Sequence, residues 1–309
     1  REGLVYSLFI GMLNSRFYEV TLKDSPPFVG ASSGYGGFIG DQNSFSLNAS
    51  VKKGQTLAAI TELLREANRT IQHGFTASEL SRQKQSLLRR DEKFATEIDT
   101  IKSRSYASEY VRHFLNNESI AGMDHYLLMS KAFLPTITIK EVNQVGKKFL
   151  KQDNRLITIT APSSEKGTLP SIGDIEAAWH SVAKESLLAY QDSVVNKDLM
   201  QKVPAAGAVV KKHFNQATQS HYWTLSNGAK VTLKQTDFKK DQILFSAMSE
   251  GGMSLLDDNT YSKTLLSSTI VDYMGVAGYD QVALGKFSKG KNFRVSSFIS
   301  SLSEGFNGF

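Results

Sequence analysis

The sequence predicts an α+β protein of two modules, because helical and strand patterns follow one another in runs, without the regular strand–helix–strand alternation of a parallel sheet. A length of 309 residues corresponds to about two domains. An irregular segment separates two stretches of different organisation. We therefore expect a first module over residues 1–162, a helical linker over residues 163–215 and a second module over residues 216–309.

The first module is predicted to open with a helix, a strand and a second helix. Apolar residues recur at helical spacing over residues 2–22, and Ser25-Pro26-Pro27 ends that helix. Residues 43–51 alternate apolar and polar side chains, which indicates a strand with one buried face. Helical spacing returns over residues 56–72.

A capping box marks the start of the next helix. In Thr76-Ala77-Ser78-Glu79 the threonine hydroxyl can accept from the Glu79 N–H, and the glutamate carboxylate can accept from the Thr76 N–H. No Pro or Gly interrupts the helical pattern over residues 76–121. One straight helix of that length is unusual in a globular domain, so we expect a kink or break within it.

Two further patterns complete the first module. A second capping box, from Thr138 to Glu141, opens a helix that runs to about Leu150. Residues 155–160 have the composition of a strand, which Ala161-Pro162 ends.

The linker and the second module differ from the first module in their predicted elements. Residues 172–190 fit one helix. Asn227-Gly228, between two short strand patterns, predicts a hairpin with a type I′ turn. A strand, a helix, a short helix and a strand are then expected over residues 243–248, 259–274, 280–288 and 293–299.

Composition and charge narrow the class of protein. The chain has no cysteine, which excludes disulfides and thiolate metal sites. The lack of cysteine suits the periplasm or another oxidising part of the cell envelope, and it is also found in many cytosolic proteins. No apolar run is long enough for a membrane span. The net charge of +6 comes from Lys and Arg spread along the chain, so we expect no nucleic-acid partner.

Both ends have the pattern of cuts through a longer polypeptide. The chain opens at Arg1, within an amphipathic pattern and without an initiator Met, and it stops at Phe309 without a polar tail. We therefore expect both modules to be truncated.

Four segments carry a resemblance to a known family. They are His73-Gly74-Phe75-Thr76 leading to Glu79-Leu80, the run Phe133–Thr138 leading to Glu141-Val142, the closing run Arg155–Pro162 and the hairpin Leu225–Lys234. In their order and spacing they resemble the pitrilysin/insulinase family of zinc metallopeptidases, over most of the chain.

The resemblance implies a clamshell of four α+β modules, each an antiparallel sheet with helices packed on one face. The modules would enclose a chamber that admits peptides or unfolded proteins as substrates. In the family, the two His of an HxxEH pentad and a downstream Glu bind zinc, and the pentad Glu activates the water. By this resemblance the chain holds most of the second module, the linker between the halves and the start of the third module.

The zinc pentad itself is absent from the sequence. The histidines form no HxxEH, HExxH or H-x-H pattern; they are His73, His113, His125, His180, His213 and His221. The stretch Lys263–Tyr273, which corresponds to the zinc helix by the resemblance, has no His, and Asp272 alone cannot replace three ligands. We expect zinc in the parent protein but no zinc and no catalytic residue in this chain.

Arg16 is the one substrate-binding candidate. In the family's last module a comparable Arg, followed about seven residues later by a Tyr, helps to hold substrate near the metal. Here Lys23 stands at that spacing, and no Tyr follows until Tyr35. A surface or helix-terminal role for Arg16 is therefore favoured over a substrate contact.

Three other patterns are interpreted as structural. The glycine-rich run over residues 34–40 precedes a strand, which favours a flexible or bulged sheet segment over a phosphate loop. His113 and His125 have no third ligand in view, and no GxSxG supports a serine nucleophile. Aromatic side chains at intervals of four residues predict core packing; they are Tyr106, Tyr110 and Phe114.

Three hypotheses follow for function. The favoured one is a non-catalytic region of a zinc metalloendopeptidase, which forms chamber wall and hinge beside the remaining modules of the same polypeptide. The alternative is a non-catalytic homologue that acts as a peptide-binding or structural subunit beside an active peptidase. The third is an unrelated α+β interaction protein.

Overall fold

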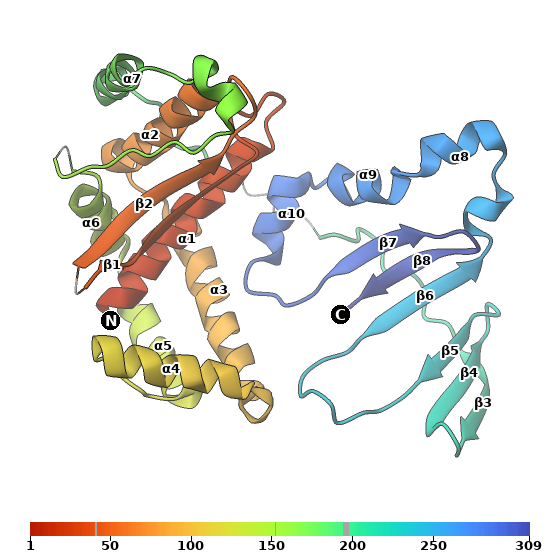
Figure 1. Ribbon diagram of the computed structural model, residues 1–309. Coiled ribbons are helices and arrows are strands. Elements are labelled where there is room, and N and C mark those ends of the chain that lie inside the picture. The colour runs from red at the N-terminus through yellow and green to blue at the C-terminus, as the bar shows by residue number, and fades with distance from the viewer. Residues whose placement is uncertain (41, 152, 194–197) are drawn as a thin grey trace. The chain divides into compact units, whose positions relative to one another are not determined.

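The computed structural model describes residues 1–40, 42–151, 153–193 and 198–309 (Figure 1). The chain forms two compact units. Unit 1 comprises Arg1–Ala95, Ser103–Val194 and Val282–Asn292, and unit 2 comprises Thr96–Lys102, Val195–Gln281 and Phe293–Phe309.

Helix α1 is the centre of unit 1. It spans Glu2–Thr21, and its buried side chains follow the helical spacing of the apolar pattern. Strands β1 (Gly30–Ile39) and β2 (Gln42–Ser50) pair antiparallel, and β1 packs against α1. The pairing register shifts between Gly37 and Ile39, so the glycine-rich run is a bulged sheet segment, as predicted.

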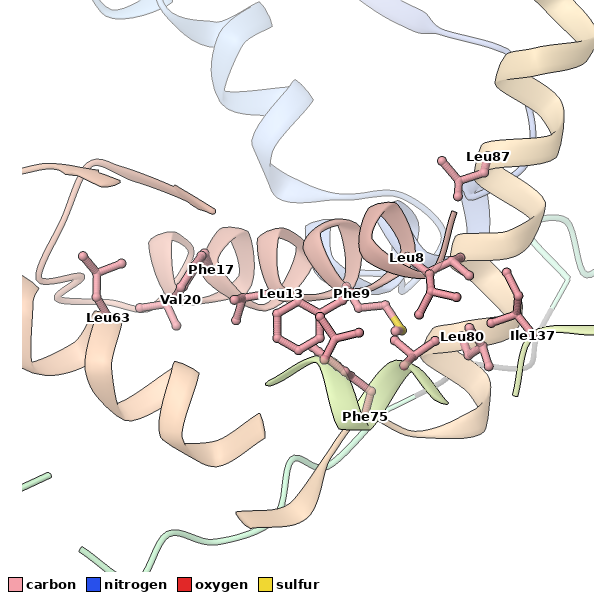
Figure 2. Packing of buried hydrophobic residues seen from close by; sticks show 14 of the residues in the cluster. Leu8, Phe9, Leu13, Phe17, Val20, Leu63, Phe75, Leu80, Leu87 and Ile137 are labelled. Carbon is pink, nitrogen blue, oxygen red and sulfur yellow. The ribbon is translucent and has the colours of Figure 1, made fainter. Parts of the chain in front are cut away.

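Three more helices build around α1. Helices α2 (Thr56–His73) and α6 (Ile139–Phe149) contact α1, and α7 (Ile172–Lys184) packs on α2. The core cluster follows the buried face of α1 from Leu8 to Val20 and takes in Leu63 of α2 (Figure 2). Leu80, Leu87 and Ile137 lie at its other end, near Leu8, and Phe75 lies beside Phe9 (Figure 2).

The long helical pattern after residue 76 is broken, as predicted. It forms α3 (Ala77–Thr96), the short 3₁₀ helix η1 (Ile98–Thr100) and α4 (Ser103–Asn116). Helix α5 (Met123–Phe133) and the 3₁₀ helix η2 (Leu134–Thr136) lead to α6. Both predicted capping boxes are present at the starts of α3 and α6.

Three predictions in unit 1 are wrong. Residues 155–160 form no strand, because no described strand pairs with them, and the Leu156 side chain is 79% exposed. The linker helix ends at Lys184 instead of 190, since Glu185 turns to extended backbone (φ −67°, ψ 126°). The aromatic stripe of α4 is not core packing: Tyr110 and Phe114 are 55% and 84% exposed, because α4 buries none of its described residues.

Unit 2 contains two antiparallel sheets of three strands among its described residues. The first has the order β3-β4-β5, with strands at Val209–Asn215, Ser220–Leu225 and Lys230–Leu233. The second has the order β6-β8-β7, with β6 at Phe245–Glu250, β7 at Val295–Ile299 and β8 at Ser303–Gly308. Strand β3 lies inside the range assigned to the linker; the module boundaries themselves stay predictions.

The helix predicted over residues 259–274 is two helices. After the 3₁₀ helix η4 (Gly252–Leu255), α8 (Asp258–Thr264) and α9 (Ser267–Met274) are separated at Leu266, whose φ of −104° and ψ of 3° are not helical. The Ser267 hydroxyl donates to the Thr264 carbonyl at 2.7 Å and so competes with backbone pairing there. Helix α10 (Gln281–Ser288) matches the short helix that was predicted.

The β4–β5 hairpin is confirmed, but its turn is of another type. The Gly228 N–H donates to the Leu225 carbonyl at 2.9 Å, and the Leu225 N–H donates to the Ala229 carbonyl at 2.8 Å. Gly228 has φ +85°, whereas Asn227 keeps a negative φ. This is a type I turn followed by a left-handed glycine, and the Asn227 Oδ1 supports it by accepting from the Ala229 N–H at 3.1 Å.

Gly252 offers a test of the packing in unit 2. Its φ is +60°, and a Cβ there would lie 2.3 Å from the Ser300 carbonyl oxygen. Gly252→Ala should therefore cost about 1–3 kcal/mol of stability and lower the urea midpoint of unfolding measured by circular dichroism. Gly36→Ala, where a Cβ meets nothing within 4 Å, is the control and should leave the midpoint close to wild type. A wild-type midpoint for Gly252→Ala would contradict this packing.

Candidate functional site

The most unusual site in unit 1 is a buried arginine in the middle of α1. Arg16 is 2% exposed. Its Nε and Nη2 donate to the two carboxylate oxygens of Glu79 at 2.8 and 2.9 Å, and Nη2 also donates to the Gly74 carbonyl at 3.0 Å. The guanidinium carbon lies 4.5 Å from the ring centre of Phe75 and 4.3 Å from that of Tyr190. The surface or helix-terminal role favoured for Arg16 is therefore wrong.

The buried arginine is positioned by the capping box of α3. The Glu79 Oε2 accepts from the Thr76 N–H at 2.8 Å, while the Glu79 N–H donates to the Thr76 hydroxyl at 3.2 Å. The same carboxylate, 6% exposed, is the counter-charge of Arg16. Glu79 thus caps the start of α3 and also neutralises the charge of Arg16 in α1. These two interactions hold the two helices together.

A second layer of charged groups surrounds Tyr190. Its hydroxyl donates to both carboxylate oxygens of Glu19 at 2.8 Å. Lys286 of α10 lies 3.2 Å from Glu19 and 3.1 Å from Asp192. Asp192 also accepts from Arg82 of α3 at 2.8 and 2.9 Å. Residues far apart in sequence therefore meet in one ionic junction, which we define as Arg16, Glu19, Glu79, Arg82, Tyr190, Asp192 and Lys286.

Two groups of this junction, Tyr190 and Asp192, have shifted pKa values. Burial, with the hydrogen bond to Glu19 and the negative charges around it, raises the pKa of the Tyr190 phenol far above its usual range. For Asp192, burial alone would raise the pKa, but hydrogen bonds from Ser78, Arg82 and Lys286 outweigh it and leave the pKa below its ordinary value. The junction thus holds a neutral phenol and an ionised carboxylate, an arrangement suited to fixing structure.

The described residues include no group of three His, Asp or Glu side chains that could hold a metal ion. The His73 Nε2 lies 2.6 Å from the Leu187 carbonyl, and the His113 Nδ1 lies 2.6 Å from the Glu118 carbonyl. Asp272 is exposed on α9.

The junction was only partly visible in the sequence. Arg16 was singled out, and Glu79 was read as a helix cap. Tyr190 was assigned to the end of a helix, Asp192 to the linker segment after that helix, and Lys286 to ordinary surface charge. A charged residue among the apolar positions of α1 is the one signal that pointed to a buried partner, because arginine is rarely buried unpaired.

The architecture of the chain is that of pitrilysin/insulinase-type peptidases. It matches the periplasmic protease PqqL from Escherichia coli with a TM-score of 0.54 and 20% identity, over 99% of this chain and 34% of that chain. The ferredoxin protease FusC, in complex with Arabidopsis ferredoxin, matches with a TM-score of 0.53 and 18% identity over the same shares. A Yersinia pestis insulinase-family protease matches 59% of this chain and 39% of its own, with a TM-score of 0.50 and 16% identity.

Two curated proteins are also similar in sequence. The Arabidopsis thaliana protein named zinc protease PQQL-like is 26% identical over 280 residues, which cover 90% of this chain. The probable zinc protease PqqL of Haemophilus influenzae is 22% identical over 239 residues, which cover 77% of this chain. The chain spans about a quarter of each relative, 26% and 25% of their lengths. No family model matches. The resemblance to pitrilysin/insulinase-type peptidases is confirmed, and the chain is a relative of PqqL-like zinc proteases.

The buried pair gives a stability prediction. Arg16→Ala leaves the Glu79 carboxylate buried without its counter-charge, so unfolding should become easier by about 3–5 kcal/mol, measured by urea denaturation. Arg112→Ala removes one partner of an exposed pair with Glu118, where the side chains are 52% and 49% exposed. This control should cost less than about 1 kcal/mol. Equal losses in the two variants would show that burial of the pair has no special weight.

The lowered pKa of Asp192 gives a pH prediction. Its folded pKa lies below the unfolded value of about 3.9, so its ionic contacts contribute fully above that pH and are lost as pH falls through the folded pKa. The melting temperature of wild type should exceed that of Asp192→Asn at pH 7, and the gap should shrink below about pH 4. Asp237→Asn, at an exposed position, should match wild type throughout. A gap that persists unchanged to pH 2 would contradict the assignment.

Proposed function

We propose that this chain is a non-catalytic region of a zinc-dependent metalloendopeptidase that degrades or processes peptides. The observation that carries the proposal is the match of nearly the whole chain to about a quarter of PqqL-like zinc proteases, together with the absence of HxxEH from its sequence. Zinc would be held elsewhere in the polypeptide, where it supplies a bound water of lowered pKa. Residues 1–162, 163–215 and 216–309 are proposed as second module, linker and start of the third.

The role we assign to this region is chamber wall and hinge. The core cluster lies in unit 1 around α1, while large apolar side chains are exposed in both units and are numerous in unit 2. Phe238, Ile243 and Leu255 are 79%, 81% and 76% exposed. Exposed apolar surface on this scale supports the proposal that unit 2 packs against neighbouring modules, which would cover these side chains.

Substrate and location follow from the same reasoning. A peptide or unfolded protein is the proposed substrate class, and the ferredoxin bound by a structurally similar protease supports protein substrates. The periplasm or cell envelope is the proposed compartment, supported by the absence of cysteine and by a periplasmic structural neighbour. Among the described residues, no helix is both long and apolar enough to cross a membrane.

A direct substrate contact by Arg16 stays a prediction. The guanidinium would first have to become accessible, because it is hydrogen-bonded to Glu79 and covered by the ring of Tyr190.

A second candidate function rests on the same missing pentad: a non-catalytic homologue that binds peptides or supports an active partner. The two candidates differ in the sequence upstream of Arg1, where the first requires an intact HxxEH and the second a degenerate one.

Zinc content and peptide cleavage, measured on the full-length parent and on this chain side by side, test the proposal. We expect about one zinc and chelator-sensitive cleavage in the parent, and neither in this chain. The absence of both from the parent would instead support the non-catalytic homologue. Zinc-dependent cleavage by this chain alone would overturn both candidates.

A further inference from the structure

One face of α2 is a row of polar side chains that bind the end of α7 and the extended segment that follows it. Arg65, Asn68, Arg69, Gln72 and His73 have the spacing i, i+3, i+4, i+7 and i+8, which places them on one helix face. The Asn68 side chain donates to the Val182 carbonyl in the last turn of α7, and the other four side chains contact the stretch that follows α7. We call residues 185–192 the strap.

In the first half of the strap, the side chains of α2 form hydrogen bonds with the backbone. The Gln72 side chain donates to the Glu185 carbonyl at 2.8 Å and accepts from the Leu187 N–H at 3.0 Å, as a neighbouring strand would. His73 donates to the Leu187 carbonyl, and Arg69 donates to the Leu188 carbonyl. These contacts fix the register of an extended backbone without a sheet.

Side chains of the strap are also bound or buried by unit 1. The Glu185 carboxylate accepts from the Arg65 Nε at 2.9 and 3.0 Å. Leu187 is 6% exposed, whereas Leu188 is 84% exposed. Tyr190 lies over Arg16, and Asp192 binds Arg82 and Ser78 of α3. The buried and paired positions are an acid, a leucine, an aromatic residue and a second acid, while the residues between them face outward.

These contacts are those of a receptor and a peptide ligand. We propose that the polar face of α2 and the first turns of α3 form a recognition groove for an extended peptide with the pattern Glu-x-Leu-x-x-Tyr-x-Asp. The strap is the ligand of this groove, held in cis. The groove accepts the same sequence in trans when the cis strap is weakened. This inference does not depend on the proposed peptidase function.

The first test uses a fluorescent synthetic peptide that spans Lys184–Ser193, with the full chain as receptor. In wild type the tethered strap competes at an effective concentration of about millimolar, so the peptide should bind weakly. In the Tyr190→Ala/Asp192→Ala chain it should bind saturably and at least tenfold more tightly, with an affinity that falls as salt rises. The control chain Asp237→Ala/Phe238→Ala loses a carboxylate and an aromatic ring at exposed positions and should behave as wild type.

Two further binding measurements test whether Tyr190, Asp192 and Arg82 form the contacts that the inference requires. A peptide with alanine in place of Tyr190 and Asp192 should lose at least tenfold in affinity for the weakened chain. Adding Arg82→Ala to that chain should reduce binding of the original peptide. If the double variant has wild-type circular dichroism but binds no peptide, or binds a scrambled peptide equally, the inference is wrong. If the double variant unfolds, the isosteric Asp192→Asn chain replaces it, and binding no tighter than wild type would also overturn the inference.

Discussion

Unit 1 depends on the buried contact between Arg16 and Glu79. An arginine in the core is tolerated only if its charge is matched and most of its donors are used, because removal of both ions from water is costly. In Arg16 the buried Nη1 has no hydrogen-bond partner among the described residues. Here the carboxylate engages Nε and Nη2, the Gly74 carbonyl takes a further bond, and two rings cover the faces of the guanidinium. Since Glu79 is also the cap of α3, the start of that helix and the placement of α1 are set by one carboxylate.

The rest of the junction extends this arrangement outward. Tyr190 covers Arg16, and its hydroxyl binds Glu19 from the same helix as Arg16. Asp192 then links α3 to α10 through Arg82 and Lys286. In this way the segment after α7 becomes part of unit 1, although it has no regular secondary structure.

Local signals in the sequence predicted most of the fold. Helical periodicity located α1 and α2, and capping boxes located the starts of α3 and α6, because both depend on neighbouring residues only. The failures involve contacts at long range. Residues 155–160 have strand composition but no described partner strand, and the aromatic stripe ending at Phe114 has helical spacing but no covering surface. Arg16 was identified as unusual, yet its burial depended on Tyr190, which no local pattern connects with it.

The junction also sets an order of assembly during synthesis. Glu19 is made early, but its partner Lys286 belongs to a short segment, Val282–Asn292, that follows most of unit 2 in the chain. Contacts that close such long loops form late, because the loop entropy must be overcome before the contact contributes. As the chain leaves the ribosome, α1 and α2 can pack at once. The ion pairs of Glu19 and Asp192 with Lys286 can form only after Lys286 has been synthesised. The last cation of the ionic junction, Lys286, therefore arrives only near the end of translation of this region.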